Sequence, residues 1–424
     1  MTDAFDRWTQ NRTVRSLGTN SGSAPLAFQG WHHFKEAFPP ELIRRAIDED
    51  RAQVGSCLDP FGGSGTTALA CQFLDVASTT VEVNPFLTDV IRAKICTYEA
   101  DELVSNLGSV LRASRLFERH DLEAQFCGLP GTFLEPGLDG RWLFSRDCAA
   151  EVGALASAIS ELRREDHVRF FRVILGGILV ELSNATVNGK GRRYRRNWQD
   201  RQSNARDVRV AFSARASDAI AEVHKHRHRP MPETRVIEGD AREVALGTSH
   251  DVAVFSPPYP NSFDYTDVYN IELWMLGYLK DTADNQRLRQ STLTSHVQLL
   301  REYSKPPEGS ERLDTIVDEL LNVQDRLWSR WIPAMVGGYF ADMMGLLDRV
   351  ADALRPGGTC WMVVGDSRYA AVHIPTAEIL SQLVVQRGWS IELMDPFRSM
   401  RSSAQQGGRD ELAETLVVTR RTGS

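Results

Sequence analysis

The stretch LDPFGGSGTTALA (Leu58–Ala70) decides how the chain folds. It begins with apolar residues, continues with glycines and ends with helix-forming residues, which is typical of a strand, a tight turn and the start of a helix. Gly62, Gly63 and Gly65 allow the turn and leave room for a ligand beside the backbone. Thr66 suits the first turn of the helix, whose unpaired N–H groups would face that ligand. The stretch lacks the Gly-Lys pair of a P-loop, which leaves a cofactor turn or an ordinary left-handed connection.

Apolar runs and helix-like segments alternate along much of the remaining chain. Seven runs are candidate strands: 55–61, 78–83, 234–240, 251–258, 359–366, 390–397 and 415–419. Strands that are separated by helical segments indicate βαβ units. We therefore expect an α/β fold built on a mostly parallel sheet.

The 424 residues are enough for two to three domains, and two long insertions interrupt the alternating pattern. They span 97–231 and 281–344, and insertions of this length usually build recognition surface or subunit contacts. The expected core comprises 31–96, 232–280 and 345–424. Residues 1–30 are polar and are expected to form a flexible arm.

Acidic residues stand at the ends of two candidate strands. Glu82 ends the strand after the glycine turn, where an acid commonly holds the two hydroxyls of a ribose. Asp240 ends the next strand and could accept a hydrogen bond from an adenine amine. Open α/β sheets bind ligands at the carboxyl ends of their strands, so we expect both acids in one nucleotide-type cofactor site. A surface charge is the alternative for Glu82.

The segment FSPPYP (Phe255–Pro260) ends the strand that begins at Asp251, so it belongs to the same edge of the sheet. Its prolines could simply terminate the strand. They could also hold a carbonyl rigidly toward a pocket, with the hydroxyl of Ser256 and the ring of Tyr259 beside it. A planar base with an exocyclic amine would satisfy all three groups.

Such a clamp suits the methylation of a poor nucleophile. The amine lone pair of cytosine or adenine is delocalised into the ring, and hydrogen bonds from its N–H groups would bring it toward tetrahedral geometry. A sulfonium methyl group held in line could then be attacked directly, with no covalent enzyme intermediate. A base within a duplex would first have to be flipped out of the stack.

Together, LDPFGGSGTT, VEVNP and SPPYPNSFDYTDVYNIELWMLGY resemble the amino-group DNA methyltransferases that use S-adenosylmethionine. The serine before the prolines resembles the N4-cytosine members, whereas the adenine members favour Asp or Asn there. HHFKEAFPPELIRRAI (32–47) is similar to the segment that closes over the methionine part of the cofactor, and the carboxyl-terminal residues are similar to the family's final hairpin. In many N4-cytosine enzymes the SPPY segment precedes the glycine turn, and here it follows.

The resemblance implies a fold, an activity and a set of site residues. The implied fold is a seven-stranded, mostly parallel Rossmann-like sheet, and the implied reaction is methyl transfer to the N4 amine of cytosine within a short sequence of double-stranded DNA. The cofactor would be bound by Lys35, Phe38, Asp59, Phe61, Gly62, Gly63, Gly65, Thr66, Glu82 and Asp240. The target amine would be held by Ser256, Pro257, Pro258 and Tyr259, and no metal ion is implied.

The charge distribution adds a candidate DNA contact. The net charge is −7, but residues 190–229 contain twelve Lys and Arg against four Asp and Glu. Arginines interleaved with aromatic residues suit phosphate contact and base stacking, although a charge run is often only a solvated surface. The candidate contacts are Lys190, Arg192, Arg193, Arg195 and Arg196. The insertion at 281–344 is the second candidate for target recognition.

The six cysteines form no CxxC pair, so a zinc site or a disulfide framework is not indicated and a reducing cytoplasm is expected. The amino terminus lacks the apolar region of a signal peptide. The longest apolar run, at 173–180, is too short to span a bilayer and predicts a buried helix or strand.

Several alternatives stay open. Adenine N6 methylation is the nearest, followed by methylation of RNA or of a protein amide, and by a non-catalytic DNA-binding subunit. A C5-cytosine mechanism is disfavoured because no cysteine follows a proline. Restriction or phage-defence proteins are candidate partners, and the oligomeric state is open.

Overall fold

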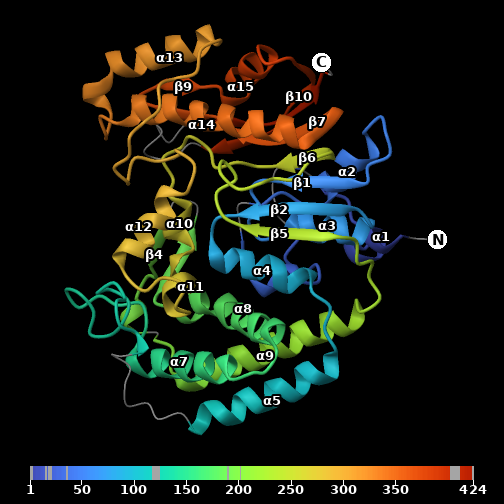
Figure 1. Cartoon of the computed structure of the whole chain (residues 1–424). Coiled ribbons are helices and arrows are strands. Elements are labelled where there is room, and N and C mark those ends of the chain that lie inside the picture. Colours follow the sequence, from blue (N-terminus) through green and yellow to red (C-terminus); the bar gives the residue numbers. More distant parts are fainter. Residues whose placement is uncertain are drawn as a thin grey trace.

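The computed structural model describes residues 3–14, 17, 22–34, 37–116, 125–188, 191–200, 202–401 and 411–422. A seven-stranded sheet in the order β10-β11-β7-β6-β1-β2-β5 lies at its centre (Figure 1). Its strands are β1 (Ser56–Asp59), β2 (Ala77–Glu82), β5 (Thr234–Glu238), β6 (His250–Phe255), β7 (Leu354–Gly365), β10 (Trp389–Arg401) and β11 (Glu411–Arg421). The neighbours from β7 to β5 pair in parallel, and β11 lies antiparallel between β7 and β10. The expected α/β fold is confirmed, and every candidate strand belongs to this sheet.

The strand order reverses between β1 and β6, and this reversal creates the functional edge. From β1 the chain builds outward to β2 and β5, and it then returns to place β6 on the other side of β1. In register, Leu58 of β1 stands opposite Thr79 of β2 and Ala253 of β6. The glycine turn after β1 and the SPPY segment after β6 therefore leave the sheet from adjacent strands, which is where open α/β sheets bind ligands.

Helices cover both faces of the sheet (Figure 1). One apolar core lies against α2 (Glu41–Asp48), α3 (Thr66–Leu74) and α4 (Pro85–Ile95). A second core lies on the opposite face against α13 (Glu311–Asn322), α14 (Ile332–Ala353) and α15 (Thr376–Val385). Successive β1 residues divide between them, because Cys57 belongs to the first core and Leu58 to the second. This alternation is what a strand buried on both faces requires.

The described part of residues 97–231 forms a helical layer outside α4. It contains α5 (Ala100–Leu116), α7 (Arg146–Ser160), α8 (Glu165–Leu182), α9 (Ala205–Lys225) and the hairpin of β3 (Ala185–Asn188) and β4 (Gly191–Tyr194). The apolar run at 173–180 is the buried centre of α8. A side-chain carbon at Gly176 would come within 2.5 Å of the Phe86 ring, so the glycine permits close packing of α8 on α4.

Residues 281–344 contain exposed elements and parts of the second core. The exposed elements are α12 (Thr282–Gln290) and a 3-10 turn, η4 (Gln324–Arg326), whereas α13 buries Leu313, Ile316 and Leu320 in the second core. The following helix, α14, begins at Ile332 and continues to Ala353, so the expected boundary at 344 falls inside a core helix.

The amino-terminal residues are not the loose arm that their composition suggested. Helix α1 (Ala4–Thr9) packs on α3, where the Trp8 ring stacks on Phe73 with centroids 4.5 Å apart and planes inclined by 6°. The Trp8 indole donates to the Ala27 carbonyl at 3.1 Å. Phe5 and Trp8, one helical turn apart, supply the apolar face that the polar average concealed.

The remaining elements are short. They are α10 (Tyr265–Val268), α11 (Asn270–Met275), β8 (Ser367–Tyr369), β9 (Val372–Ile374) and the 3-10 turns η1 (Gln29–Trp31) and η3 (Trp198–Asp200). In the part of the chain that the structure describes, no helix combines the length and apolarity needed to cross a membrane.

Candidate active site

A cavity of about 660 Å³ opens at the carboxyl ends of the central strands. Its walls come from the glycine turn, the ends of β2 and β5, the SPPY segment, and a stretch at 291–296 from the second insertion. The volume lies within the range of small-molecule sites. One continuous space is therefore lined by all four target residues and by every described cofactor candidate except Gly65.

The glycine turn is held against β2 at close range. The Gly62 N–H donates to the Val81 carbonyl at 2.8 Å, and a side-chain carbon at Gly62 would lie 2.6 Å from the Thr80 hydroxyl. Gly65 has a φ of 82° as it leads into α3, a left-handed conformation that glycine adopts without strain. The glycines at 62 and 65 thus serve the turn itself, and the turn residues from Gly62 to Ser64 form a wall of the cavity.

Two buried carboxylates frame this turn. Asp59 accepts from the Phe61 N–H at 2.9 Å, and burial raises the pKa of Asp59 to about 6 against the effect of that bond. Glu82 accepts from the Gly63 N–H at 2.7 Å and from the Asn84 N–H at 2.8 Å. Burial also raises the pKa of Glu82, to about 7. Glu82 thereby links the glycine turn to the end of β2 and lines the cavity.

Aromatic residues from the segment before α2 cover the turn. Phe38 is buried and lines the cavity, whereas Lys35 lies outside the described residues. Phe34 also lines the cavity, 3.1 Å from where a side-chain carbon of Gly63 would lie. Its ring stacks on Tyr269 with centroids 4.8 Å apart. The sequence analysis missed Phe34, although the residue stands beside Lys35 in the segment singled out there.

The cofactor half of the cavity fits S-adenosylmethionine. Ser64 and Thr66 carry hydroxyl oxygens that are buried without a hydrogen-bond partner among the described residues, and both residues line the cavity where α3 begins. Glu82 supplies carboxylate oxygens for a ribose, while Phe38 and Phe61 supply apolar walls. Unpaired polar atoms beside apolar walls are what an amphipathic nucleotide-like ligand needs.

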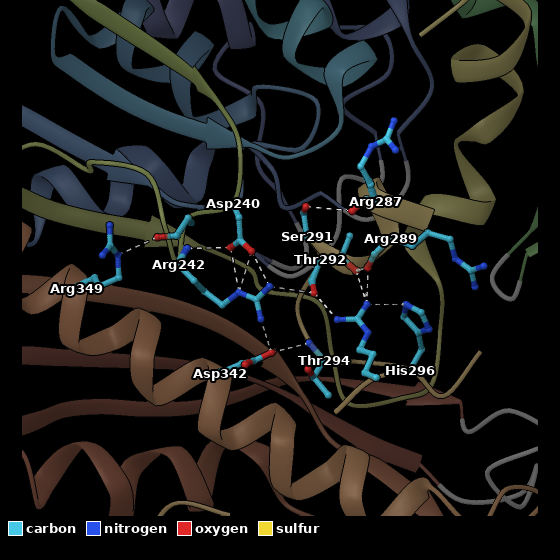
Figure 2. Close-up of polar contacts among 12 residues, drawn as sticks. Asp240, Arg242, Arg287, Arg289, Ser291, Thr292, Thr294, His296, Asp342 and Arg349 are labelled. Atoms are coloured by element: carbon cyan, nitrogen blue, oxygen red, sulfur yellow. Dashed lines mark hydrogen bonds and ion pairs between the residues drawn. The ribbon is translucent and has the colours of Figure 1, made fainter. Parts of the chain in front are cut away.

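Asp240 lines the cavity as predicted, but its carboxylate is already engaged (Figure 2). The Arg242 guanidinium donates to both Asp240 oxygens at 2.6–3.1 Å, and to Asp342 at 2.7 Å. Arg242 also reaches the Thr292 carbonyl at 3.3 Å. Asp342 in turn accepts from the Thr294 N–H at 2.9 Å. The side chain expected at the adenine is thus part of a network that ties β5 to α14 and to the 291–296 wall.

The SPPY segment presents its hydroxyl groups together. The Ser256 hydroxyl donates to the Val363 carbonyl at 3.0 Å and lies 3.3 Å from the Tyr259 hydroxyl. The Tyr259 hydroxyl donates to Glu414 at 2.8 Å. Burial and the Glu414 carboxylate together raise the pKa of Tyr259 well above its usual value. Ser256, both prolines and Tyr259 all line the cavity, and Glu414 joins them from the last strand.

Asp264, which follows the SPPY segment and could help to position a target amine, is held by its own neighbours. It caps α10 by accepting from the Thr266 and Asp267 N–H groups, and it forms an ion pair with Arg289 at 2.6 Å. His296, the Thr266 hydroxyl and the Arg289 guanidinium hold the pKa of Asp264 below its usual value in spite of burial.

The basic hairpin lies beside α10 (Figure 1). Its arginines do not all face outward. Arg192 donates to the Asn270 side chain at 2.6 Å and lies over the Phe133 ring. Arg195 donates to three carbonyls at the end of α8 and the start of β3. Both therefore serve packing and capping. Arg193 and Arg196 are exposed, and Lys190 lies outside the described residues.

Comparisons with known proteins show what the chain is similar to. Residues 3–92 match a family model described as a DNA methylase and named for N6 and N4 methylation. The type II methyltransferase M.AvaI of a Nostoc species is 24% identical over 426 residues, which cover 92% of this chain and 86% of the relative. M.BsoBI of Geobacillus stearothermophilus is 24% identical over 461 residues, which cover 95% and 86%.

These matches confirm the resemblance carried by the motifs. The chain is thus similar to the amino-group DNA methyltransferases of the N6/N4 type, and S-adenosylmethionine is the cofactor expected of that class. The family model embraces both methylated bases, so the choice between cytosine and adenine depends on the site itself.

Proposed function

We propose that this amino-group DNA methyltransferase modifies the exocyclic N4 amine of cytosine within a short, specific sequence of double-stranded DNA. The observation that carries the proposal is the placement of Ser256. Its hydroxyl hydrogen points to the Val363 carbonyl, which leaves the oxygen lone pairs as acceptors inside the cavity that Glu82 and the glycine turn also line. A serine at this position is the feature that resembles the N4-cytosine enzymes.

Different residues of the chain would bind the cofactor and the target base. Glu82 and the backbone of the glycine turn would hold the ribose and methionine parts of S-adenosylmethionine, which supplies an electrophilic methyl group when bound. Ser256 and a carbonyl of the proline pair would accept the two amine hydrogens of the target. Those bonds draw the nitrogen lone pair out of conjugation and orient it, which is catalysis by positioning.

The Tyr259 ring would form the stacking surface for the target base. Its hydroxyl is anchored to Glu414 at one end and lies near Ser256 at the other, so the ring orientation is set before a base arrives. Stacking on an aromatic side chain contributes about 1–3 kcal/mol per base. The cavity is recessed below the surface, so a cytosine in a duplex would have to leave the helix to reach it.

Exposed groups around the cavity would contact the DNA backbone. Arg193 and Arg196 project from the hairpin next to α10, and α12 in the second insertion carries no buried residue. These surfaces lie on the side of the molecule that carries α10 (Figure 1). We assign them to phosphate contact, and the 291–296 wall to the neighbourhood of the flipped base.

The test is to identify the methylated nucleoside. The purified protein is incubated with tritiated S-adenosylmethionine and duplex DNA or RNA, and the product is digested to nucleosides. Label in N4-methylcytosine supports the proposal, whereas label in N6-methyladenine or in RNA assigns the site to those substrates instead. A protein that binds cofactor and DNA but transfers no label would be a non-catalytic subunit.

A further inference from the structure

Glu414 is a buried acid in an apolar strand face. It stands in the middle of β11 with 4% of its surface exposed, and its neighbours on the same face of the strand are Leu412, Leu416 and Val418, all buried. A carboxylate in such a position costs stability unless it is well paired.

One contact of Glu414 leads directly to the active site. It accepts the Tyr259 hydroxyl at 2.8 Å, across 155 residues of sequence, and lines the same cavity as Ser256. In the sheet, Glu414 stands opposite Gly365 of β7, two residues beyond the Val363 carbonyl that accepts the Ser256 hydroxyl. The paired strands β7 and β11 therefore supply one partner each to the two polar side chains of SPPY.

The reaction creates a charge at this point. The acceptor nitrogen forms the N–C bond with its lone pair while the pair of the C–S bond stays on sulfur, so the nitrogen becomes positively charged and then releases one proton to water. A negative charge placed nearby before the reaction favours this change, and it does so strongly where water is excluded. Ser256 is a neutral group and cannot supply such a charge.

We propose that Glu414 is a positioning residue of this active site, a carboxylate that fixes the Tyr259 ring and places a negative charge behind the Tyr259–Ser256 pair. The inference rests on the proposed function of that pair in holding the target amine. It adds a residue from the far end of the chain that acts through Tyr259 and has no direct contact with the methyl group.

Two substitutions test separately the negative charge of Glu414 and its hydrogen bond with the Tyr259 hydroxyl. Glu414→Gln keeps an oxygen that can accept from Tyr259 but removes the charge. Tyr259→Phe keeps the ring but removes the hydroxyl. We expect Glu414→Gln to lower the single-turnover rate of methyl transfer by about 10²-fold, with the cofactor dissociation constant changed by less than about twofold. The exposed Glu378→Gln in α15 is the matched control and should keep the wild-type rate.

The second readout needs neither cofactor nor DNA. In protein labelled at the tyrosine ζ carbon, the Tyr259 signal, assigned with Tyr259→Phe, should shift in Glu414→Gln because the hydroxyl then donates to a neutral amide. An unchanged Tyr259 signal, or a Glu414→Gln rate equal to that of the wild type, would overturn the proposal. If Glu414→Gln fails to fold, the methyl-transfer rate of Tyr259→Phe tests the proposal instead. A wild-type rate in Tyr259→Phe would overturn the proposal, because Glu414 is proposed to act through the Tyr259 hydroxyl. A wild-type protein that methylates no DNA would refute the proposed function instead, and the carbon signal would still report on the contact.

Discussion

Replacing Glu82 by glutamine should make the protein more stable at alkaline pH while it weakens cofactor binding. Burial raises the pKa of Glu82 from 4.5 to about 7. Between these two pH values the folded state binds more protons than the unfolded state, so the carboxyl group lowers the free energy of unfolding as pH rises from about 4.5 to about 7. At about 1.4 kcal/mol for each pH unit between the two pKa values, the cost reaches about 3 kcal/mol at pH 8.

Glutamine cannot ionise, so the free energy of unfolding of the Glu82→Gln variant does not fall with rising pH for this reason. The variant loses one acceptor, because the Gly63 and Asn84 N–H groups both donate to Glu82 and an amide offers them a single oxygen. That loss is the same at every pH. The pH-dependent part of the stability difference is therefore the measurable quantity, and it should grow by about 2–3 kcal/mol in favour of the variant between pH 5 and pH 8.

The assay is urea unfolding of both proteins at several pH values, with cofactor titration calorimetry alongside. The exposed Glu238→Gln at the end of β5 is the control and should change stability by less than about 0.5 kcal/mol at each pH. A difference between wild type and Glu82→Gln that does not vary with pH would refute the reasoning. So would a variant that binds the cofactor as tightly as the wild type does.

Three further predictions concern the turn, the hairpin and the clamp. Gly62→Ala should cost about 1–3 kcal/mol of stability by urea unfolding, because the new carbon meets the Thr80 hydroxyl. The control Gly345→Ala should cost none, because its new carbon meets nothing within 4 Å. Equal losses of stability in the two variants would contradict this account. Replacing Arg193 and Arg196 by alanine should reduce the slope of log affinity for DNA against log salt by about 2, and an unchanged slope would remove the hairpin from the interface. Tyr259→Ala should abolish methyl transfer and keep cofactor binding, and unchanged turnover would exclude the stacking role.

The sheet and its functional edge could be predicted because their signals are local. Each buried strand is a short apolar run, and Glu82 and Ser256 stand at the ends of such runs, so parallel pairing alone brings them to one edge. The amino-terminal helix escaped prediction because only Phe5 and Trp8 carry its apolar face.

Side-chain partners could not be predicted, because they depend on which face of an element a residue occupies and on contacts distant in sequence. Arg192 and Arg193 are neighbours in β4, yet one bonds to Asn270 in the interior and the other is exposed, as strand alternation dictates. Arg242 belongs to no recognisable motif. Its guanidinium bonds to Asp240 and also to Asp342, a residue of α14 that is distant in sequence. The sequence marks Glu414 only weakly, as an acid on an otherwise apolar strand face. Nothing in the sequence predicts its contact with Tyr259.

The most direct measurement of the central claim is single-molecule sequencing of DNA from cells that express the protein, compared with cells that express Tyr259→Ala. The account predicts N4-methylcytosine at one recurring short sequence in the first sample and none in the second. N6-methyladenine at the recurring sequence, or N4-methylcytosine that persists in the Tyr259→Ala sample, would contradict it.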